Sequence, residues 1–221
     1  MGMRKLLYSV AIILLTANCC LAYTGMKPQE SLIKAGTVKL NQYWQLTLEQ
    51  DYVADDQGRD ICFTQSDMGL VCKPMTDWFE LGVNYRRIYQ RTEDDPYKAI
   101  DRPRLNIALR GQIFAFDASC ASRFEYRNQE RQKDFWRYGN KFALKFQPLV
   151  PAFKLQPYIA YDFSADLNST SDFASRGFSS GASFKLSQNL TGDFYCRWQT
   201  SRYGDIFYDY RVIGTALRFT F

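Results

Sequence analysis

The sequence predicts an all-β protein, and within that class a single up-and-down antiparallel transmembrane β-barrel of about ten strands, in a range of about 8–12. Apolar and polar residues alternate with period two from segment to segment, which is the pattern of half-buried strands. No apolar run after Leu15 is long enough to form a membrane-spanning helix. The third observation is the aromatic content, since 16% of the residues are Phe, Trp or Tyr.

Residues 1–22 have the features of a secretory signal peptide. Arg4 and Lys5 form a positive start, an apolar stretch follows, and Cys20-Leu21-Ala22 ends in a small-x-small motif. The apolar stretch is too short to cross a bilayer, which takes ~20 apolar residues. We therefore expect a signal peptide over 1–22, a periplasmic N-terminal segment over 23–36 and an outer-membrane β-barrel over 37–221.

About ten segments of the remaining chain are predicted to be strands. In most segments the apolar side chains share one parity and the charged or amide side chains share the other; the alternation is weaker near 60–72, 119–128 and 173–187. Between 136 and 146, for example, Trp136, Tyr138 and Phe142 alternate with Arg137 and Lys141. In chain order the segments are 38–49, 60–72, 79–86, 104–110, 119–128, 136–146, 153–163, 173–187, 190–199 and 213–221.

The connections favour a membrane barrel over a soluble sandwich, whose strands also alternate. Long polar connections are predicted at 51–59, 92–102, 164–172 and 200–208, a further polar connection at 129–133, and short ones at 73–76, 116–118, 148–151 and 187–189. Long and short links that alternate are typical of extracellular loops at one rim and periplasmic turns at the other. This pattern predicts that both termini lie in the periplasm.

A sheet in lipid must close on itself, because no water is present to pair its backbone polar groups. The outward side chains must then be apolar, and aromatic residues gather at the two interfaces. The predicted interfacial residues are Trp78, Tyr89, Phe135, Trp136, Tyr158 and Phe163. The last strand ends on Phe219 and Phe221, which we expect to act as the barrel-assembly signal.

Charged side chains of the polar parity are predicted to face the lumen. Arg123, Glu125 and Arg127 share one face of one strand, so a carboxylate lies between two guanidinium groups. Two interpretations stay open: an ion-paired plug, because buried charges must be paired, or a narrow anion-preferring pore, because basic residues outnumber acids. The predicted lumen-facing cluster is Arg86, Arg104, Arg110, Arg123, Glu125, Arg127, Arg137, Lys141, Asp162 and Arg197.

The chain contains no histidine, which removes several classes of site. Ser-His-Asp and Cys-His hydrolases and histidine-based metal sites are excluded. Carboxylates such as Glu80 and Glu125 are better explained as ion-pair partners than as an acid–base pair. We expect no enzyme activity, no catalytic residues, no metal and no cofactor. The net charge of +5 is too small to indicate nucleic-acid binding.

Four cysteines follow the predicted signal peptide, at positions 62, 72, 120 and 196. Cys62 and Cys72 lie on one predicted strand, whose ends would be ~30 Å apart, so a disulfide between them would require a loop there. Cys120 and Cys196 share the parity of apolar neighbours, which indicates small lipid-facing residues. The sequence leaves open whether any of the four form disulfides.

The order of these features resembles the uncharacterised outer-membrane β-barrel family catalogued as domain of unknown function 2490. The resemblance covers most of the chain after the signal peptide and implies the same fold and compartment, but it implies no activity. It rests on the segments Tyr43–Leu48, Gly69–Lys73, Asp77–Arg86, Arg102–Asn106 and Arg123–Arg127 and on the terminal Phe221.

The function that the sequence predicts is a non-enzymatic bacterial outer-membrane barrel with a structural or interaction role. A narrow anion-preferring pore for small solutes is the alternative, and a secreted soluble β-barrel that binds a small ligand is third. The expected partners are outer-membrane lipid and lipopolysaccharide, together with the barrel-assembly machinery, which would recognise the C-terminal strand. No nucleic-acid partner is expected.

Overall fold

The structure is a computed structural model that describes residues 29–54, 61–74, 76–90, 98–129, 134–149, 154–167, 174–203 and 206–221. The predicted signal peptide and the first part of the predicted N-terminal segment lie outside these residues. No helix in the described part of the chain is long and apolar enough to cross a membrane.

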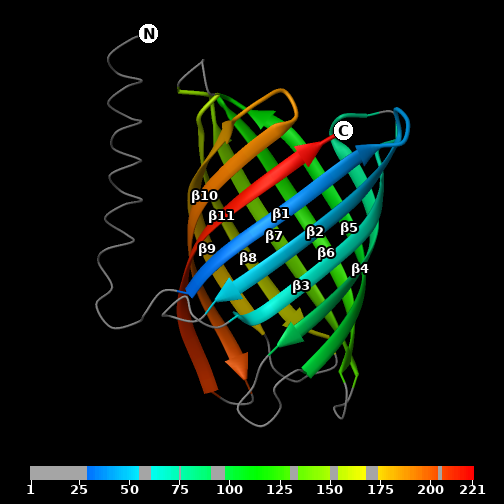
Figure 1. Ribbon diagram of the computed structural model, residues 1–221, viewed down its shortest axis with the longest axis vertical. Helices are drawn as coiled ribbons and strands as arrows, with labels where there is room; N and C mark the ends of the chain where they lie inside the picture. Colours follow the sequence, from blue (N-terminus) through cyan, green and yellow to red (C-terminus); the bar gives the residue numbers. More distant parts are fainter. Residues whose placement is uncertain are drawn as a thin grey trace.

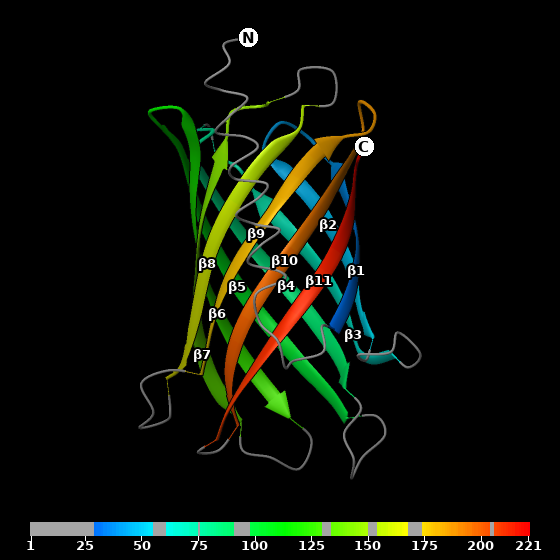
Figure 2. The same cartoon turned by 90° about the vertical axis from the view of Figure 1, so that its left-hand side faces the viewer.

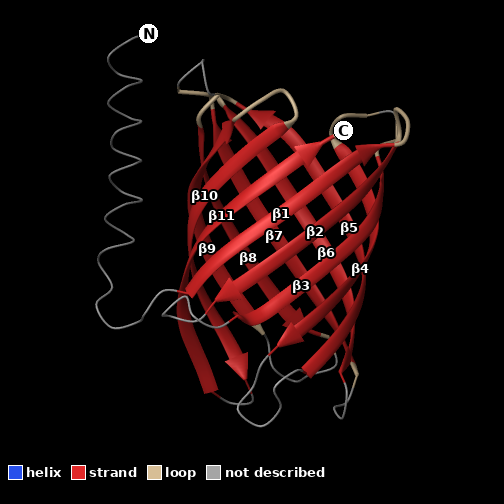
Figure 3. Ribbon diagram, viewed as in Figure 1, coloured by secondary structure: helices blue, strands red, loops and turns tan. Residues whose placement is uncertain are grey.

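The described residues form eleven strands and no helix, so the predicted all-β fold is confirmed (Figure 3). The number of strands lies within the predicted range. The strands are β1 (Gln29–Lys39), β2 (Trp44–Ala54), β3 (Ile61–Cys72), β4 (Phe79–Gln90), β5 (Lys98–Ile113), β6 (Phe116–Gln129), β7 (Phe135–Phe146), β8 (Gln156–Asp166), β9 (Ser175–Lys185), β10 (Leu190–Tyr203) and β11 (Ile206–Thr220).

The strands form one closed barrel in which each strand pairs with its neighbours in sequence (Figure 1). These sequential pairs are antiparallel, but the pair that closes the barrel, β1 with β11, is parallel. Gln29 lies opposite Val212, and Thr37 lies opposite Thr220. A fully antiparallel barrel, as the sequence predicted, needs an even number of strands, and the additional strand β1 makes that number odd.

The odd strand number places the two ends of the barrel chain at opposite rims. We call the rim where β11 ends the C-terminal rim, and the other the opposite rim; β1 begins at the opposite rim (Figures 1 and 2). The prediction that both ends face the same side is therefore wrong for the barrel. The predicted long connection at 200–208 is also wrong, because β10 continues to Tyr203 and β11 begins at Ile206. The tight turn predicted at 116–118 lies at 114–115.

The barrel begins at Gln29 and not at residue 37, where the sequence analysis placed its start. The predicted segment 38–49 is divided between β1 and β2 by a turn. In that turn the Asn41 side-chain oxygen accepts hydrogen bonds from the backbone N–H groups of Tyr43 (2.8 Å) and Trp44 (2.9 Å). An Asn side chain that bonds nearby backbone in this way ends a strand locally.

The predicted alternation separates the two faces of the closed sheet. Outward side chains are exposed, as for Val83 (62%) and Leu105 (40%), because no second layer covers the outer wall. Inward side chains shield one another, as for Ile88 (1% exposed) and Ile100 (4%) on neighbouring strands. The barrel thus has a mostly apolar outer wall, and around Ile88 and Ile100 its inward side chains pack against one another.

The predicted aromatic residues divide between the two faces. Trp78, Tyr89 and Trp136 are exposed near strand ends, as expected of interfacial residues. Phe135 faces inward instead, where the guanidinium groups of Arg127 and Arg137 lie 5.7 and 5.4 Å from its ring. Tyr158 also faces inward, since it shares the parity of the buried Ala160. Whether each ring faces outward or inward is set by the alternation of side chains along its strand. The prediction considered only how close each residue lies to a strand end.

Candidate functional site

The ten predicted lumen residues lie on the inward parity of their strands. Arg86 is on β4; Arg104 and Arg110 are on β5; Arg123, Glu125 and Arg127 are on β6; Arg137 and Lys141 are on β7; Asp162 is on β8; and Arg197 is on β10. They do not form one cluster. The structure divides all of them except Lys141 among several ion-paired groups, each organised around a carboxylate.

One group surrounds Asp67 of β3, whose side chain is 5% exposed. Its carboxylate accepts hydrogen bonds from Arg86 Nε at 2.8 Å and from Asn84 Nδ2 at 2.8 Å, and it also pairs with Arg104. The ion pair with Arg104 joins β3 to β5 across β4. Asp67 was missing from the predicted cluster, because its segment alternates only weakly. Asp67 lies two residues from the polar Gln65 and therefore shares its face of the strand, and this pairing was the signal in the sequence that Asp67 faces inward.

A second group is centred on Glu125, whose side chain is 1% exposed. Its carboxylate pairs with Arg123 Nε at 2.8 Å and with Arg127 at 3.1 Å. The structure therefore brings together the three residues that the sequence placed on one strand face. Such charge-assisted contacts compensate for the removal of the carboxylate from water.

The other side of the lumen carries further pairs. Arg197 of β10 donates to Asp162 of β8 at 2.6 Å, across Gly177 of β9. A Cβ atom at Gly177 would lie 3.1 Å from both Arg197 Nε and Asp162 Oδ1, so glycine leaves the space that this ion pair occupies. Two more pairs join neighbouring strands, Arg137 with Asp166 and Arg218 with Asp193.

Accessibility of the inward side chains changes along the barrel axis. In the half nearer the opposite rim, Asp67, Arg104 and Glu125 are buried. In the half nearer the C-terminal rim, inward cations are exposed, and Lys141, Lys145 and Lys185 have no ion-pair partner in the described part of the chain. The exposed inward cations are Arg110, Lys141, Lys145, Lys185 and Arg218. The lumen thus combines a packed, ion-paired half with a more open, positively charged half.

The outer wall also carries polar side chains, which the sequence analysis did not anticipate. Asn140 of β7 donates to Ser122 at 2.8 Å and to the Tyr138 hydroxyl at 3.0 Å, and Cys120 lies 3.5 Å from its side-chain oxygen. These residues share the outward parity of Phe142. The hydrogen bonds within this set satisfy polar groups on a wall whose large exposed side chains are mostly apolar.

Cys72, Cys120 and Cys196 form no disulfide bond among the described residues. Cys62 lies with Cys72 on the extended strand β3, as predicted, but the Cys62 side chain is outside the described part of the structure. Among the described residues, no group of His, Cys, Asp and Glu side chains is arranged to hold a metal ion.

A scan of the chain against protein-family models finds no match, and a search of curated proteins finds no similar sequence. The resemblance to the outer-membrane barrel family therefore stays a prediction from the motifs that carry it.

Proposed function

We propose that the chain is a non-enzymatic bacterial outer-membrane β-barrel with a structural or interaction role, exported by its signal peptide and related to the family that it resembles. The observation that carries this proposal is the distribution of side chains between the two faces. Large apolar residues cover the exposed outer wall, and charged residues occupy the inside of the closed sheet. This arrangement is the reverse of a water-soluble surface and suits a lipid environment.

In this proposal the ion-paired half of the lumen is closed to solutes. Pairs such as Arg104 with Asp67 and Arg197 with Asp162 cross an intervening strand and brace the barrel wall from within. The proposed partners are outer-membrane lipid and lipopolysaccharide, and the assembly machinery that would recognise the final strand through Phe219 and Phe221.

Electrophoresis with and without heating tests the proposal. A lipid-embedded barrel stays folded in cold detergent and migrates differently after boiling, so we expect heat-modifiable mobility and a requirement for detergent during purification. A folded protein that remains monomeric in water without detergent would refute the membrane assignment. That result would favour the third candidate, a secreted soluble barrel.

A narrow anion-preferring pore is the second candidate, favoured by the exposed inward cations near the C-terminal rim. Conductance in planar bilayers separates it from a closed barrel. Anion-selective openings that lose selectivity in the double variant Lys141→Gln, Lys145→Gln would establish the pore. A silent protein that is shown by heat-modifiable mobility to be folded would establish the closed barrel.

A further inference from the structure

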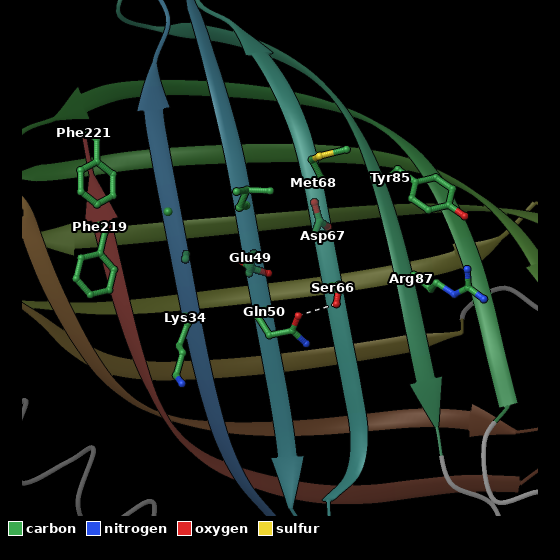
Figure 4. A pocket seen from close by; sticks show the side chains of 13 residues that line it. Lys34, Glu49, Gln50, Ser66, Asp67, Met68, Tyr85, Arg87, Phe219 and Phe221 are labelled. Atoms are coloured by element: carbon green, nitrogen blue, oxygen red, sulfur yellow. Dashed lines mark hydrogen bonds between the residues drawn. The ribbon is translucent and has the colours of Figure 1, made fainter.

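The outer wall is hollowed across β1 to β4 and beside the end of β11, in a groove of about 670 Å³ (Figure 4). Its floor includes Gly36, where an added Cβ atom would meet no other atom within 4 Å. The groove therefore exists because a strand position on the outer wall carries no side chain, while larger side chains rise on both sides of it.

The groove has an apolar half and a polar half. Met68, Phe219 and Phe221 line the half toward the C-terminal rim, and they are 56%, 38% and 68% exposed. The side chains of Lys34, Gln50, Ser66 and Arg87 line the half toward the opposite rim, as Figure 4 shows. An amphiphilic molecule that lies along the wall would meet apolar surface at one end and cations at the other.

The two cations lie on the outward parity, where a charge facing lipid is costly unless an anion compensates it. Lys34 has no ion-pair partner in the described part of the chain, and its Nζ lies 5.9 Å from the ring centre of Tyr52. Arg87 is exposed, and its ion pair with Asp101 is long, at 3.8 Å. Both cations are thus available to an anionic ligand.

Strand register sets the spacing between the cations. Lys34 lies opposite Gln50, Gln50 opposite Ser66 and Ser66 opposite Arg87. Three strand steps separate the backbones of Lys34 and Arg87 by roughly 14 Å. Between them Ser66 donates a hydrogen bond of 2.6 Å to the Gln50 side chain, so the centre of the polar half is neutral. This spacing suits two separate anionic groups better than one.

We propose that this groove binds a bisphosphorylated glycolipid, the lipid A part of lipopolysaccharide. Lys34 and Arg87 each contact one of the phosphates at the two ends of its disaccharide, and an acyl chain lies against Met68 and Phe219. The inference rests on the proposed membrane location and adds to it a specific lipid, a specific face of the barrel and the residues that select the lipid.

Titration of the full chain in detergent micelles with bisphosphorylated lipid A, followed by native mass spectrometry, tests this proposal. We expect one tightly bound lipid A per chain. The double variant Lys34→Gln, Arg87→Gln should bind lipid A at least about tenfold more weakly, because two charge-assisted contacts are lost. The control Lys145→Gln, Lys185→Gln removes the same charge from the lumen face and should bind as the unmodified chain does.

Equal binding by the groove variant and the unmodified chain would overturn the proposal. Equal losses in the groove and lumen variants would overturn it too, because they would indicate non-specific attraction. Monophosphorylated lipid A or phosphatidylglycerol that binds as tightly would contradict the two-phosphate contact. Heat-modifiable mobility, measured on each variant, separates these outcomes from failure to fold. A chain that keeps this mobility without binding lipid A refutes the groove but not the membrane barrel.

Discussion

Replacement of Glu125 by Gln is predicted to destabilise the barrel strongly. The substitution keeps the shape of the side chain but removes the negative charge between Arg123 (2.8 Å) and Arg127 (3.1 Å). Loss of one partner from a buried ion pair costs about 3–5 kcal/mol, because the other charge stays buried without compensation. The Arg127 side chain is 11% exposed and retains the full penalty, whereas that of Arg123 is 39% exposed and is partly screened. We therefore expect a loss of about 3 kcal/mol.

The free energy of unfolding can be measured by urea titration of the protein in phospholipid vesicles, followed by tryptophan fluorescence. Glu49→Gln is the matched control, because it makes the same chemical change at a more exposed carboxylate. The Glu49 side chain is 35% exposed and lies 3.5 Å from Arg86, so its loss should cost less than about 1 kcal/mol. A loss below about 1 kcal/mol for Glu125→Gln, or equal losses for the two variants, would refute the reasoning.

Three further predictions concern packing and accessibility. Gly181→Ala should lower the free energy of unfolding by about 1–3 kcal/mol, because the added Cβ would collide with the backbone oxygen of Phe194. Gly36→Ala should be tolerated, because a Cβ there meets no atom within 4 Å. Equal urea midpoints for the two variants would contradict this prediction. Phe114→Gly should stabilise the barrel by about 1 kcal/mol in the same assay, because Phe114 has a left-handed backbone (φ 54°) and its side chain is 97% exposed. A loss of stability in this variant would contradict the prediction. Cys196 is 3% exposed, so its thiol should react with a maleimide only after unfolding, and rapid labelling of the folded protein would be inconsistent with this burial.

The sequence predicts strands well where every outward position carries an apolar side chain. The segment 136–146 corresponds to β7, Phe135–Phe146, with the predicted faces. β1 was missed because its outward positions 34 and 36 hold Lys and Gly, and because Leu32 and Ile33 are adjacent apolar residues on opposite faces. The missed strand also explains why the predicted number of strands is even whereas the observed number is odd, and why the two ends of the barrel were placed at the same rim.

Prediction of the charged site was limited by strand register. The group of Arg123, Glu125 and Arg127 follows from a single strand, because residues two apart share a face. The group around Asp67 requires the alignment of β3, β4 and β5, which alternation does not specify. The outward cations of the groove were missed for a related reason: Lys34 lies on the unpredicted strand, and Arg87 follows the inward-facing Arg86 at the end of a predicted segment.

Accessibility of a spin label along β5 tests the membrane barrel most directly. Single nitroxide labels at positions 105 to 109, in a cysteine-free variant embedded in lipid vesicles, report collisions with lipid-soluble oxygen and with a water-soluble nickel complex. Leu105 and Leu109 face outward, and Asn106 faces inward, where its side chain donates to Asn84 at 2.6 Å. We predict oxygen maxima at 105, 107 and 109 and minima at 106 and 108. A profile without alternation, or nickel access at the odd positions equal to that of oxygen, would contradict a barrel with its apolar wall in lipid.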